Sequence, residues 1–440
     1  MPVKNYDFTK DYSFHGEFWH DPTDNKGRFS AKIEYSSYNG LTLDYCISDS
    51  DSPKKCERLY GILNTGEPCT LIGEFDFTHS AIRLGKVKVL TGLHQFSIMI
   101  FGGFYDESKN LDSCYLSLHG LQEFIHPQGR ITQLKFSTKP ILSTKGDNWK
   151  IDLINTASFD LVGDSLTNII NCQIEDALEK FKNDFSETKS SFPNALFSIR
   201  KNLKFYLRYE KISKDTIENN ISDLWKISSL FSILLNKPIL PDDLHLRFEG
   251  NKERSPCLFT IGVEQRTIDL ATRNIHHHYL PLDWKQIDFN KIINKWFEIG
   301  ENYKSLSVTY QNETNYRTLH QAHADIILYA TQLEAINHSL NGKKEQKYMT
   351  PINEYASPTL KQNLEQAFIN LNDKSIGENI ATLRNELAHV DRTKVLMKTM
   401  KIDDYIKIGL YLKIIVTSHL LFNLGLNKEQ IERYQDKVAP

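Results

Sequence analysis

An arginine, an asparagine and a histidine stand close together in the segment SIGENIATLRNELAHVDRTK, at Arg384, Asn385 and His389. A histidine titrates near neutral pH, so it can take or give a proton. An arginine keeps its charge and presents a planar fork of N–H groups that matches a phosphate and can stabilise charge developing there. In RNA the 2′-hydroxyl can attack its own adjacent phosphate. These residue types therefore suit RNA cleavage without a metal or another cofactor, with Asn385 orienting the pair or the substrate.

The element that must position these residues is a predicted helix from Ser375 to Asp391. Its apolar face is formed by Ile376, Ile380, Leu383, Leu387 and Val390, which recur at helical spacing. At ~100° per residue, Arg384 lies about 80° from the middle of that face and His389 about 220° from it. Alanines between them would let a second helix approach closely. We therefore expect two copies of the chain to meet there and bring two Arg/His pairs into one cleft.

Spacing alone does not select this pair, because Arg273 and His278, and Arg317 and His323, show nearly the same separation. Arg273 precedes a histidine-rich loop, and Arg317 lies at the start of a predicted helix. Only Arg384 is expected in the middle of a helix beside an asparagine. The alternative for Arg384 and His389 is a helix-surface pair with structural hydrogen bonds.

Basic residues follow the pair at Arg392, Lys394, Lys398 and Lys401. The three lysines are predicted to share a helical face, where they would hold the phosphate backbone of RNA. The alternative is a solvated surface.

Other histidines are weaker candidates. The run from His276 to His278 predicts an exposed loop rather than a metal site, since consecutive histidines cannot all face one ion. His320 and His323, one turn apart, are expected to be partly buried in a helical bundle.

Composition limits the class of protein. The net charge of −2 argues against non-specific coating of nucleic acid, so any RNA site must be locally positive. Six cysteines without Cys-x-x-Cys spacing predict free thiols in a reducing cytoplasm. The N-terminus has no signal-peptide pattern. The most apolar run, from Ile406 to Leu426, is interrupted by lysine, histidine and glycine and predicts a buried helix rather than a membrane span.

The chain divides by periodicity into three parts. Residues 1–160 alternate as strands and contain Asn39-Gly40, a two-residue hairpin signal, so they predict an antiparallel β-sandwich or barrel-like domain. Residues 161–305 are mixed, with helical stretches followed by short strands from 240 to 285. Residues 306–440 predict an all-helical bundle with helices over 316–340, from Ser357-Pro358, over 375–391 and from Asp403 to Gly425. The fold class is therefore α+β and multidomain.

Several segments resemble one protein family. RNELAH strongly resembles the Arg-Asn-x-x-Ala-His signature of HEPN ribonucleases. The helix at 405–431 is similar to the terminal helix of the ApeA-like HEPN family, a group of bacterial phage-defence proteins. FHGEFWHDPTDNKGRFSAKIEYSSYNGLTLDYCI, YGILNTGEPCTLIG and CYLSLHGLQEFI resemble its N-terminal region, although His20-Asp21-Pro22 stands where the family usually has an aliphatic residue before proline.

The resemblance implies an endoribonuclease with Arg384 and His389 as the catalytic pair and Asn385 in support. Glu334 matches an acidic position that HEPN proteins often carry on an earlier helix. The resemblance also implies a bacterial cytoplasmic homodimer whose β-rich domain senses a phage protein. Two alternatives stay open: a non-catalytic module that binds RNA or protein, and a toxin silenced by a separate antitoxin.

Overall fold

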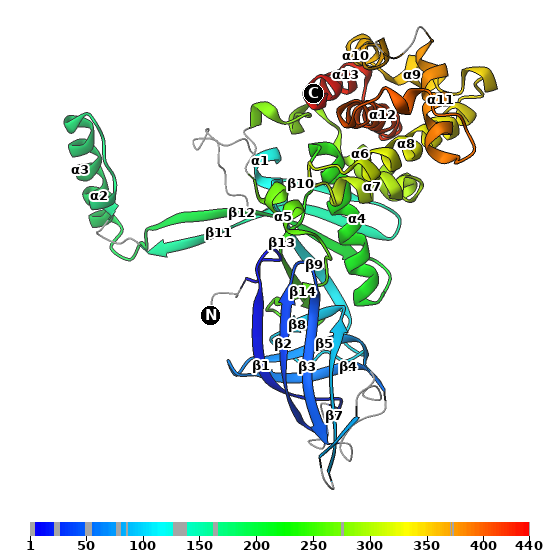
Figure 1. Cartoon of the computed structure of the whole chain (residues 1–440). Helices are drawn as coiled ribbons and strands as arrows, with labels where there is room; N and C mark the ends of the chain where they lie inside the picture. The colour runs from blue at the N-terminus through cyan, green and yellow to red at the C-terminus, as the bar shows by residue number, and fades with distance from the viewer. Residues whose placement is uncertain are drawn as a thin grey trace.

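The described strands join in one antiparallel sheet, and the C-terminal helices gather at the opposite end of the molecule from the N-terminal strands (Figure 1). The computed structural model describes residues 5–21, 27–48, 55–75, 81–84, 87–125, 139–161, 166–273, 277–369, 371 and 374–439. Within these ranges the sheet has fourteen strands, in the order β10-β11-β12-β9-β13-β14-β8-β5-β4-β1-β2-β3-β7-β6. The strands are β1 (Tyr12–Trp19), β2 (Phe29–Ser36), β3 (Gly40–Ser48), β4 (Cys56–Leu63), β5 (Pro68–Phe75), β6 (Ala81–Leu84), β7 (Val87–Phe96), β8 (Ile98–Phe101), β9 (Leu111–Leu118), β10 (Leu142–Lys145), β11 (Trp149–Leu161), β12 (Ser198–Lys211), β13 (Pro241–Phe248) and β14 (Ser255–Phe259).

The N-terminal part of the sheet closes on itself. β7 pairs with β3, whereas β8 pairs with β5, and only Ser97 separates β7 from β8. The Ser97 N–H donates to the carbonyl of Ile72 on β5 at 3.0 Å. The strands between β5 and β3 in the sheet order complete a barrel. Alternate side chains on β2 are buried, as the period-two pattern in the sequence predicts.

The hairpin predicted at Asn39-Gly40 forms, but its loop is longer than the two residues expected. β2 ends at Ser36 and β3 begins at Gly40, and these two residues are paired across the hairpin. Gly40 has φ +71°, a left-handed conformation that glycine adopts without a steric penalty. Asn39 is not left-handed, so the turn is not the type I′ that Asn-Gly indicates.

Two long strands, β11 and β12, form an extension that leaves the body of the molecule (Figure 1). Their pairing crosses the predicted boundary between residues 160 and 161. β12 also pairs with β9, and β13 joins β9 to β14, so strands from both predicted parts share one sheet. The short helix α2 (Leu166–Ile169) and α3 (Glu175–Ser191) lie at the tip of the extension. The three-part division by residue number stays a prediction.

The C-terminal part is helical, as predicted. Its helices and those that join it to the sheet are α1 (Leu121–Ile125), α4 (Ile217–Leu235), α5 (Gln265–Thr272), α6 (Phe289–Ile299), α7 (Lys304–Gln311), α8 (Leu319–Ser339), α9 (Met349–Tyr355), α10 (Pro358–Ile369), α11 (Ile376–Ala388), α12 (Ile402–Asn423) and α13 (Lys428–Val438). The prediction of strands up to residue 285 is wrong over α5, where Thr267, Ile268 and Ala271 are buried at helical spacing.

Helix α12 is the centre of the helical bundle. It packs against α8, α9, α10 and α13. Among the described residues it alone has the length and apolar composition to suit a membrane span, but 72% of its most apolar window is buried inside the protein. The burial of this helix agrees with the prediction for the run from Ile406 to Leu426.

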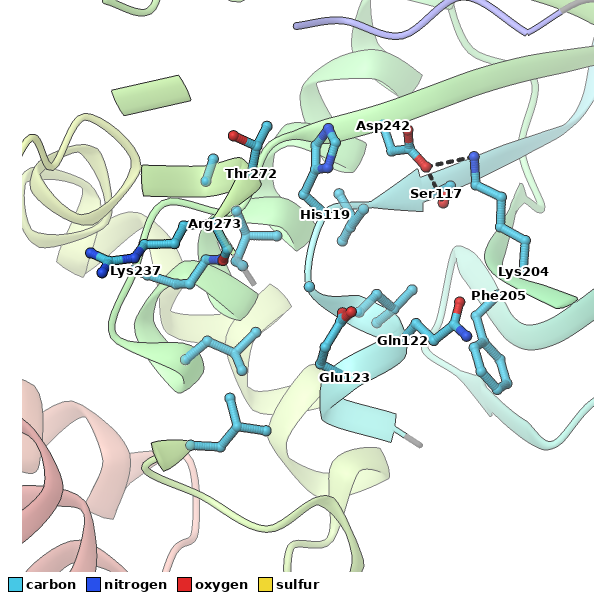
Figure 2. Close-up of a pocket in the computed structure, with 17 residues that line it drawn as sticks. Ser117, His119, Gln122, Glu123, Lys204, Phe205, Lys237, Asp242, Thr272 and Arg273 are labelled. Carbon is cyan, nitrogen blue, oxygen red and sulfur yellow. Dashed lines mark hydrogen bonds and ion pairs between the residues drawn. The ribbon is translucent and has the colours of Figure 1, made fainter. Parts of the chain in front are cut away.

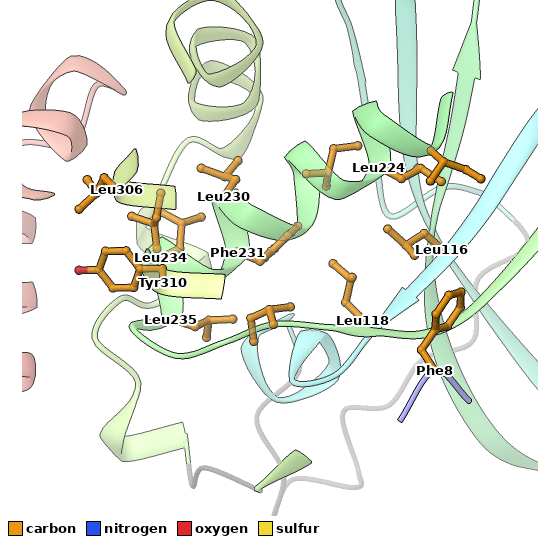
Figure 3. Packing of buried hydrophobic residues seen from close by; sticks show 14 of the residues in the cluster. Phe8, Leu116, Leu118, Leu224, Leu230, Phe231, Leu234, Leu235, Leu306 and Tyr310 are labelled. Atoms are coloured by element: carbon orange, nitrogen blue, oxygen red, sulfur yellow. The ribbon is translucent and has the colours of Figure 1, made fainter. Parts of the chain in front are cut away.

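Helix α4 links the sheet to the helical bundle (Figure 3). Leu224 lies near Leu116 of β9, and the far end of α4 meets Leu306 and Tyr310 of α7. The Tyr434 hydroxyl of α13 donates to the carbonyl of Ile233 on α4 at 2.8 Å. The two parts of the chain therefore share one continuous hydrophobic core, through which movement at one end of α4 would reach the other.

Candidate active site

Helix α11 begins where its sequence predicts. Ser375 is the N-cap, and its hydroxyl accepts from the N–H of Glu378 at 3.4 Å. The Glu378 carboxylate accepts in return from the N–H of Ser375 at 3.0 Å, which completes a capping box. Ile376, Ile380 and Leu383 are buried, so the predicted apolar face points into the bundle.

The end of α11 differs from the prediction. The helix stops at Ala388, and His389 is the C-cap with φ −125° and ψ 124°, an extended conformation. The angle of about 220° expected for His389 on a continuous helix therefore does not apply. Lys394 stabilises this helix end, because its ammonium donates to the carbonyls of Glu386 and His389. His389 and Val390 are left exposed beyond the helix.

Arg384 is half-buried and has few partners within the chain. One of its terminal N–H groups donates to the side-chain oxygen of Asn385 at 3.3 Å, a long bond. Its Nε is buried and has no hydrogen-bond partner among the described residues. The guanidinium thus keeps donors that the protein does not use.

Glu334 lies on α8, which packs against α11. Lys347 donates to its carboxylate at 2.7 Å, and the Tyr348 hydroxyl donates to the same oxygen. Burial alone would raise the pKa of Glu334, but the bonds from Lys347 and Tyr348, and the positive charge of Arg384, outweigh burial and lower that pKa. The two residues are therefore near enough for the charge of Arg384 to act on Glu334.

Glu386 supports the segment that follows His389, a role that was not predicted from the sequence. Its side chain is buried, and its carboxylate accepts from the backbone N–H groups of Val395, Leu396 and Met397 at 2.8, 3.1 and 3.0 Å. These bonds tie the segment after His389 back onto α11. A signal was present in the sequence, because Glu386 falls three residues after Leu383, on the apolar face, where a charged residue needs partners.

Two family descriptions match the chain, side by side. ApeA N-terminal domain 1 matches residues 13–296, and Apea-like HEPN matches residues 299–430. The first match alone covers more than half of the chain. The protein belongs to the ApeA-like HEPN family. No curated protein and no solved structure matches it.

The family membership confirms the resemblance drawn from RNELAH and from the N-terminal segments. The HEPN match includes Glu334, Arg384, Asn385 and His389. The structure brings Arg384 and Asn385 into contact at the last turn of α11 and leaves His389 just beyond it. The catalytic roles of these residues remain a prediction.

The basic residues after His389 do not share one helical face, which corrects the expectation for Lys394, Lys398 and Lys401. Only a short 3-10 turn, Leu396–Lys398, forms between α11 and α12. Lys398, Lys401 and Arg392 are exposed, whereas Lys394 is half-buried by its bonds to the end of α11. The loop is irregular because Glu386 and Lys394 hold it from both sides.

The other arginines and histidines with similar spacing have other surroundings. Arg317 is held by Glu313 and Asp325. The His323 ring packs edge-on against Tyr405, with ring centres 4.5 Å apart. His320 is exposed. Of the histidine run, His276 lies outside the described residues, and the carbonyl of His278 accepts from Lys437 at 3.2 Å.

One group of potential metal ligands occurs among the described residues, away from the HEPN motif. Ligand atoms of Asp7, His119 and Asp242 lie within 4.8 Å of one another. Lys204 already pairs with Asp242 at 2.5 Å, and Asp7 accepts from the backbone and hydroxyl of Thr9. An ammonium therefore neutralises part of this group.

Proposed function

We propose that this protein is an anti-phage defence effector that cleaves RNA with Arg384 and His389, without a metal. The observation that carries the proposal is the exposed end of α11. There an arginine with unused donors lies on the helix, and an exposed histidine is its C-cap, both within the HEPN match. An arginine that serves only the fold normally has its donors satisfied by the protein.

In the proposed reaction, the imidazole of His389 takes the proton of an RNA 2′-hydroxyl. The 2′-oxygen forms a bond to the adjacent phosphorus, and the bond from phosphorus to the 5′-oxygen breaks. The leaving 5′-oxygen receives a proton from a second imidazole. The products are a 2′,3′-cyclic phosphate and a 5′-hydroxyl. Arg384 stabilises the negative charge on the phosphorane oxygens, and Asn385 orients its guanidinium.

A homodimer would supply the second imidazole. The surface near His389 carries exposed apolar side chains, with Val390 98%, Val395 58% and Ile402 42% exposed. Exposed apolar side chains with polar groups at their rim favour a protein interface. A second copy seated there would bring His389 of each chain into one cleft, so that one acts as base and the other as acid.

The surrounding charges suit the same reaction. Arg392, Lys398 and Lys401 are exposed and free to contact RNA phosphates. Lys394 keeps a structural role at the end of α11 and would reach RNA only with its remaining N–H. Glu334 is a positioning residue, since its negative charge favours one orientation of the Arg384 guanidinium.

Control by the N-terminal domain is part of the proposal. A phage protein that binds the sheet domain in the bacterial cytoplasm would alter the HEPN dimer through α4. This route is supported by the contacts of α4 with β9 at one end and with α7 and α13 at the other.

Purified protein incubated with RNA tests the chemistry. Cleavage should persist in EDTA and leave 2′,3′-cyclic phosphate ends. Strict metal dependence, or a different end group, would contradict the mechanism. If the folded oligomer binds RNA but does not cleave it, the non-catalytic alternative is favoured.

Mixing unaltered and inactive chains tests the shared cleft. His389→Ala protein is expected to be inactive. After its subunits exchange with those of the unaltered protein, a mixed dimer holds only one imidazole and lacks either the base or the acid. Cleavage per unaltered chain should therefore fall as His389→Ala chains are added in excess, and cleavage that stays proportional to the unaltered chains despite proven exchange contradicts the shared cleft.

A further inference from the structure

A cavity of about 330 Å³ lies where the sheet meets the helices, far along the chain from the HEPN motif (Figure 2). It is lined by the end of β9 with α1, by β12, by the end of α4 with the link to β13 and the start of β13, by the end of α5, and by Leu280. This volume is at the lower end of the range for small-molecule sites in proteins, which is ~300–1,000 Å³.

The positive charges around the cavity are unequally neutralised. Lys204 is paired with Asp242 and Asp243 on one flank. On the opposite flank, Lys237 and Arg273 lie side by side (Figure 2). Lys237 is only 8% exposed, and its ammonium donates to the backbone carbonyl of Arg273 at 2.9 Å. Arg273 is exposed, and no described residue pairs with its guanidinium.

Burial has a measurable consequence for Lys237. It lowers the pKa of the ammonium to about 8, although the negative charge of Glu123 works in the other direction. Burying a charged ammonium costs free energy, and a carbonyl oxygen, which has no full negative charge, compensates only part of that cost. An anion in the cavity would offset that cost.

The rest of the lining is mixed, since Ser117, His119, Gln122, Glu123 and Thr272 are polar and most of the remaining residues are apolar. Leu121, Leu235, Ile239 and Leu280 are all buried at the cavity wall. A ligand that combines one anionic group with an apolar or aromatic body would match both parts of the lining.

We propose that this cavity binds a small organic anion, a phosphate monoester or a carboxylate, through Lys237 and Arg273. The Glu123 carboxylate and the ends of α4 and α5, which bear partial negative charge, oppose an anion. Each such end is equivalent to about half an elementary charge, whereas Arg273 carries a full positive charge and Lys237 carries one when it is protonated. The carbonyls of Ile233 and Ser232 at the end of α4 are moreover already satisfied by backbone N–H groups.

Isothermal titration calorimetry on the full chain tests the proposal. Phenyl phosphate, adenosine monophosphate and benzoate are the probes, and uncharged adenosine is the control ligand. Phenyl phosphate and benzoate carry one ring on two different anions, so they identify which anion binds. At least one anionic probe should bind, and adenosine should not. Failure of all the anionic probes to bind at millimolar concentration overturns the proposal.

Two variants locate the binding. Arg273→Gln and Lys237→Met should each weaken binding at least about tenfold, the effect of losing one charged hydrogen bond. Arg266→Gln is the matched control, because Arg266 lies on the same helix, is exposed and does not line the cavity. Equal affinity in Arg273→Gln and in the unaltered protein overturns the site, and this variant keeps the test valid if Lys237→Met fails to fold.

Proton uptake gives a second readout. Because an anion favours the charged form of Lys237, binding at pH 8.5 should take up protons, seen as a heat that depends on the buffer. The effect should vanish in Lys237→Met. Binding without proton uptake would exclude Lys237 from the site. None of these measurements depends on RNA cleavage, so the cavity and the nuclease can fail separately.

Discussion

Arg317 and Arg384 lie in the same helical domain, and each is followed within six residues by a histidine, yet their surroundings are opposite. Both terminal nitrogens of Arg317 donate to Glu313 at 2.7 Å, and its Nε donates to Asp325 at 2.8 Å. Arg384 has one long bond, to Asn385 at 3.3 Å, and a buried Nε without a partner among the described residues.

The histidines differ in the same sense. His323 is half-buried, and burial first and His320 second lower its pKa. His389 is exposed at the end of α11. The comparison teaches that the use of the donors, rather than the spacing, separates an arginine that holds the fold from one that is free to hold a substrate.

The largest expected effect is on cleavage. Arg384→Ala and His389→Ala should each reduce the rate of RNA cleavage at least about 100-fold, because general acid–base catalysis contributes ~10²–10⁴-fold. The unfolding temperature should hardly change, since the protein uses little of either side chain. Cleavage assays and circular dichroism on the same samples measure both. A folded double variant with full activity would end the claim that this is the catalytic pair.

Arg317→Met should have the opposite result. It leaves the buried Glu313 carboxylate with fewer partners, and breaking a buried ion pair costs ~3–5 kcal/mol. Lys413 still donates to Glu313 at 3.1 Å, so the loss should be nearer the lower value. Urea unfolding measures it, and cleavage per folded molecule should be retained. Lost activity with unchanged stability would reverse the roles of the two arginines.

Glu386→Gln should give an intermediate effect, on both stability and cleavage. The amide group places N–H donors against the backbone N–H groups that the carboxylate now accepts, which costs roughly 1–3 kcal/mol. Hydrogen exchange of the amides of Val395, Leu396 and Met397 should become faster, and cleavage should fall as the loop after His389 loosens. Glu378→Gln, at the exposed start of α11, is the matched control. Unchanged exchange in Glu386→Gln would show that another group holds the loop.

The smallest expected effect is on acid stability. Burial raises the pKa of Glu313, but the charge of Lys413 and the bonds from Arg317 outweigh burial and lower that pKa from 4.5 to about 2. The folded pKa lies below the unfolded one, so the carboxylate stabilises the fold above pH 4.5, and this stabilisation is lost as the pH falls towards 2.

Urea midpoints at pH 6 and pH 3 check this prediction. The free energy of unfolding obtained from these curves should change less between pH 6 and pH 3 in Glu313→Gln than in the unaltered protein, by roughly 1–2 kcal/mol. Asp325, whose pKa is raised mainly by burial, acts in the opposite direction in both proteins, so its contribution largely cancels from the comparison. An equal difference in both proteins would contradict the assignment.

Much of the fold follows from local pattern. The helix predicted over 316–340 forms as Leu319–Ser339, and Ser357 caps α10, the helix predicted to begin at Ser357-Pro358. Alternation predicts the strands of the barrel. These features are predictable because caps and periodicity act over a few residues. The closure of the barrel through Ser97 was not predictable, since it joins strands that are distant in the sequence.

The sequence by itself determined the family, the start of α11 and the three possible Arg/His pairs. Only the tertiary structure decided which arginine is already occupied, because nearby carboxylates accept from Arg317 and none among the described residues accepts from Arg384. It also decided that α11 ends before His389. The loop that follows folds back onto the helix, where the Lys394 ammonium donates to the Glu386 carbonyl and the Val395 N–H donates to the Glu386 carboxylate. Spacing along a chain fixes which residues can be neighbours, and folding fixes which hydrogen bonds they have left to offer.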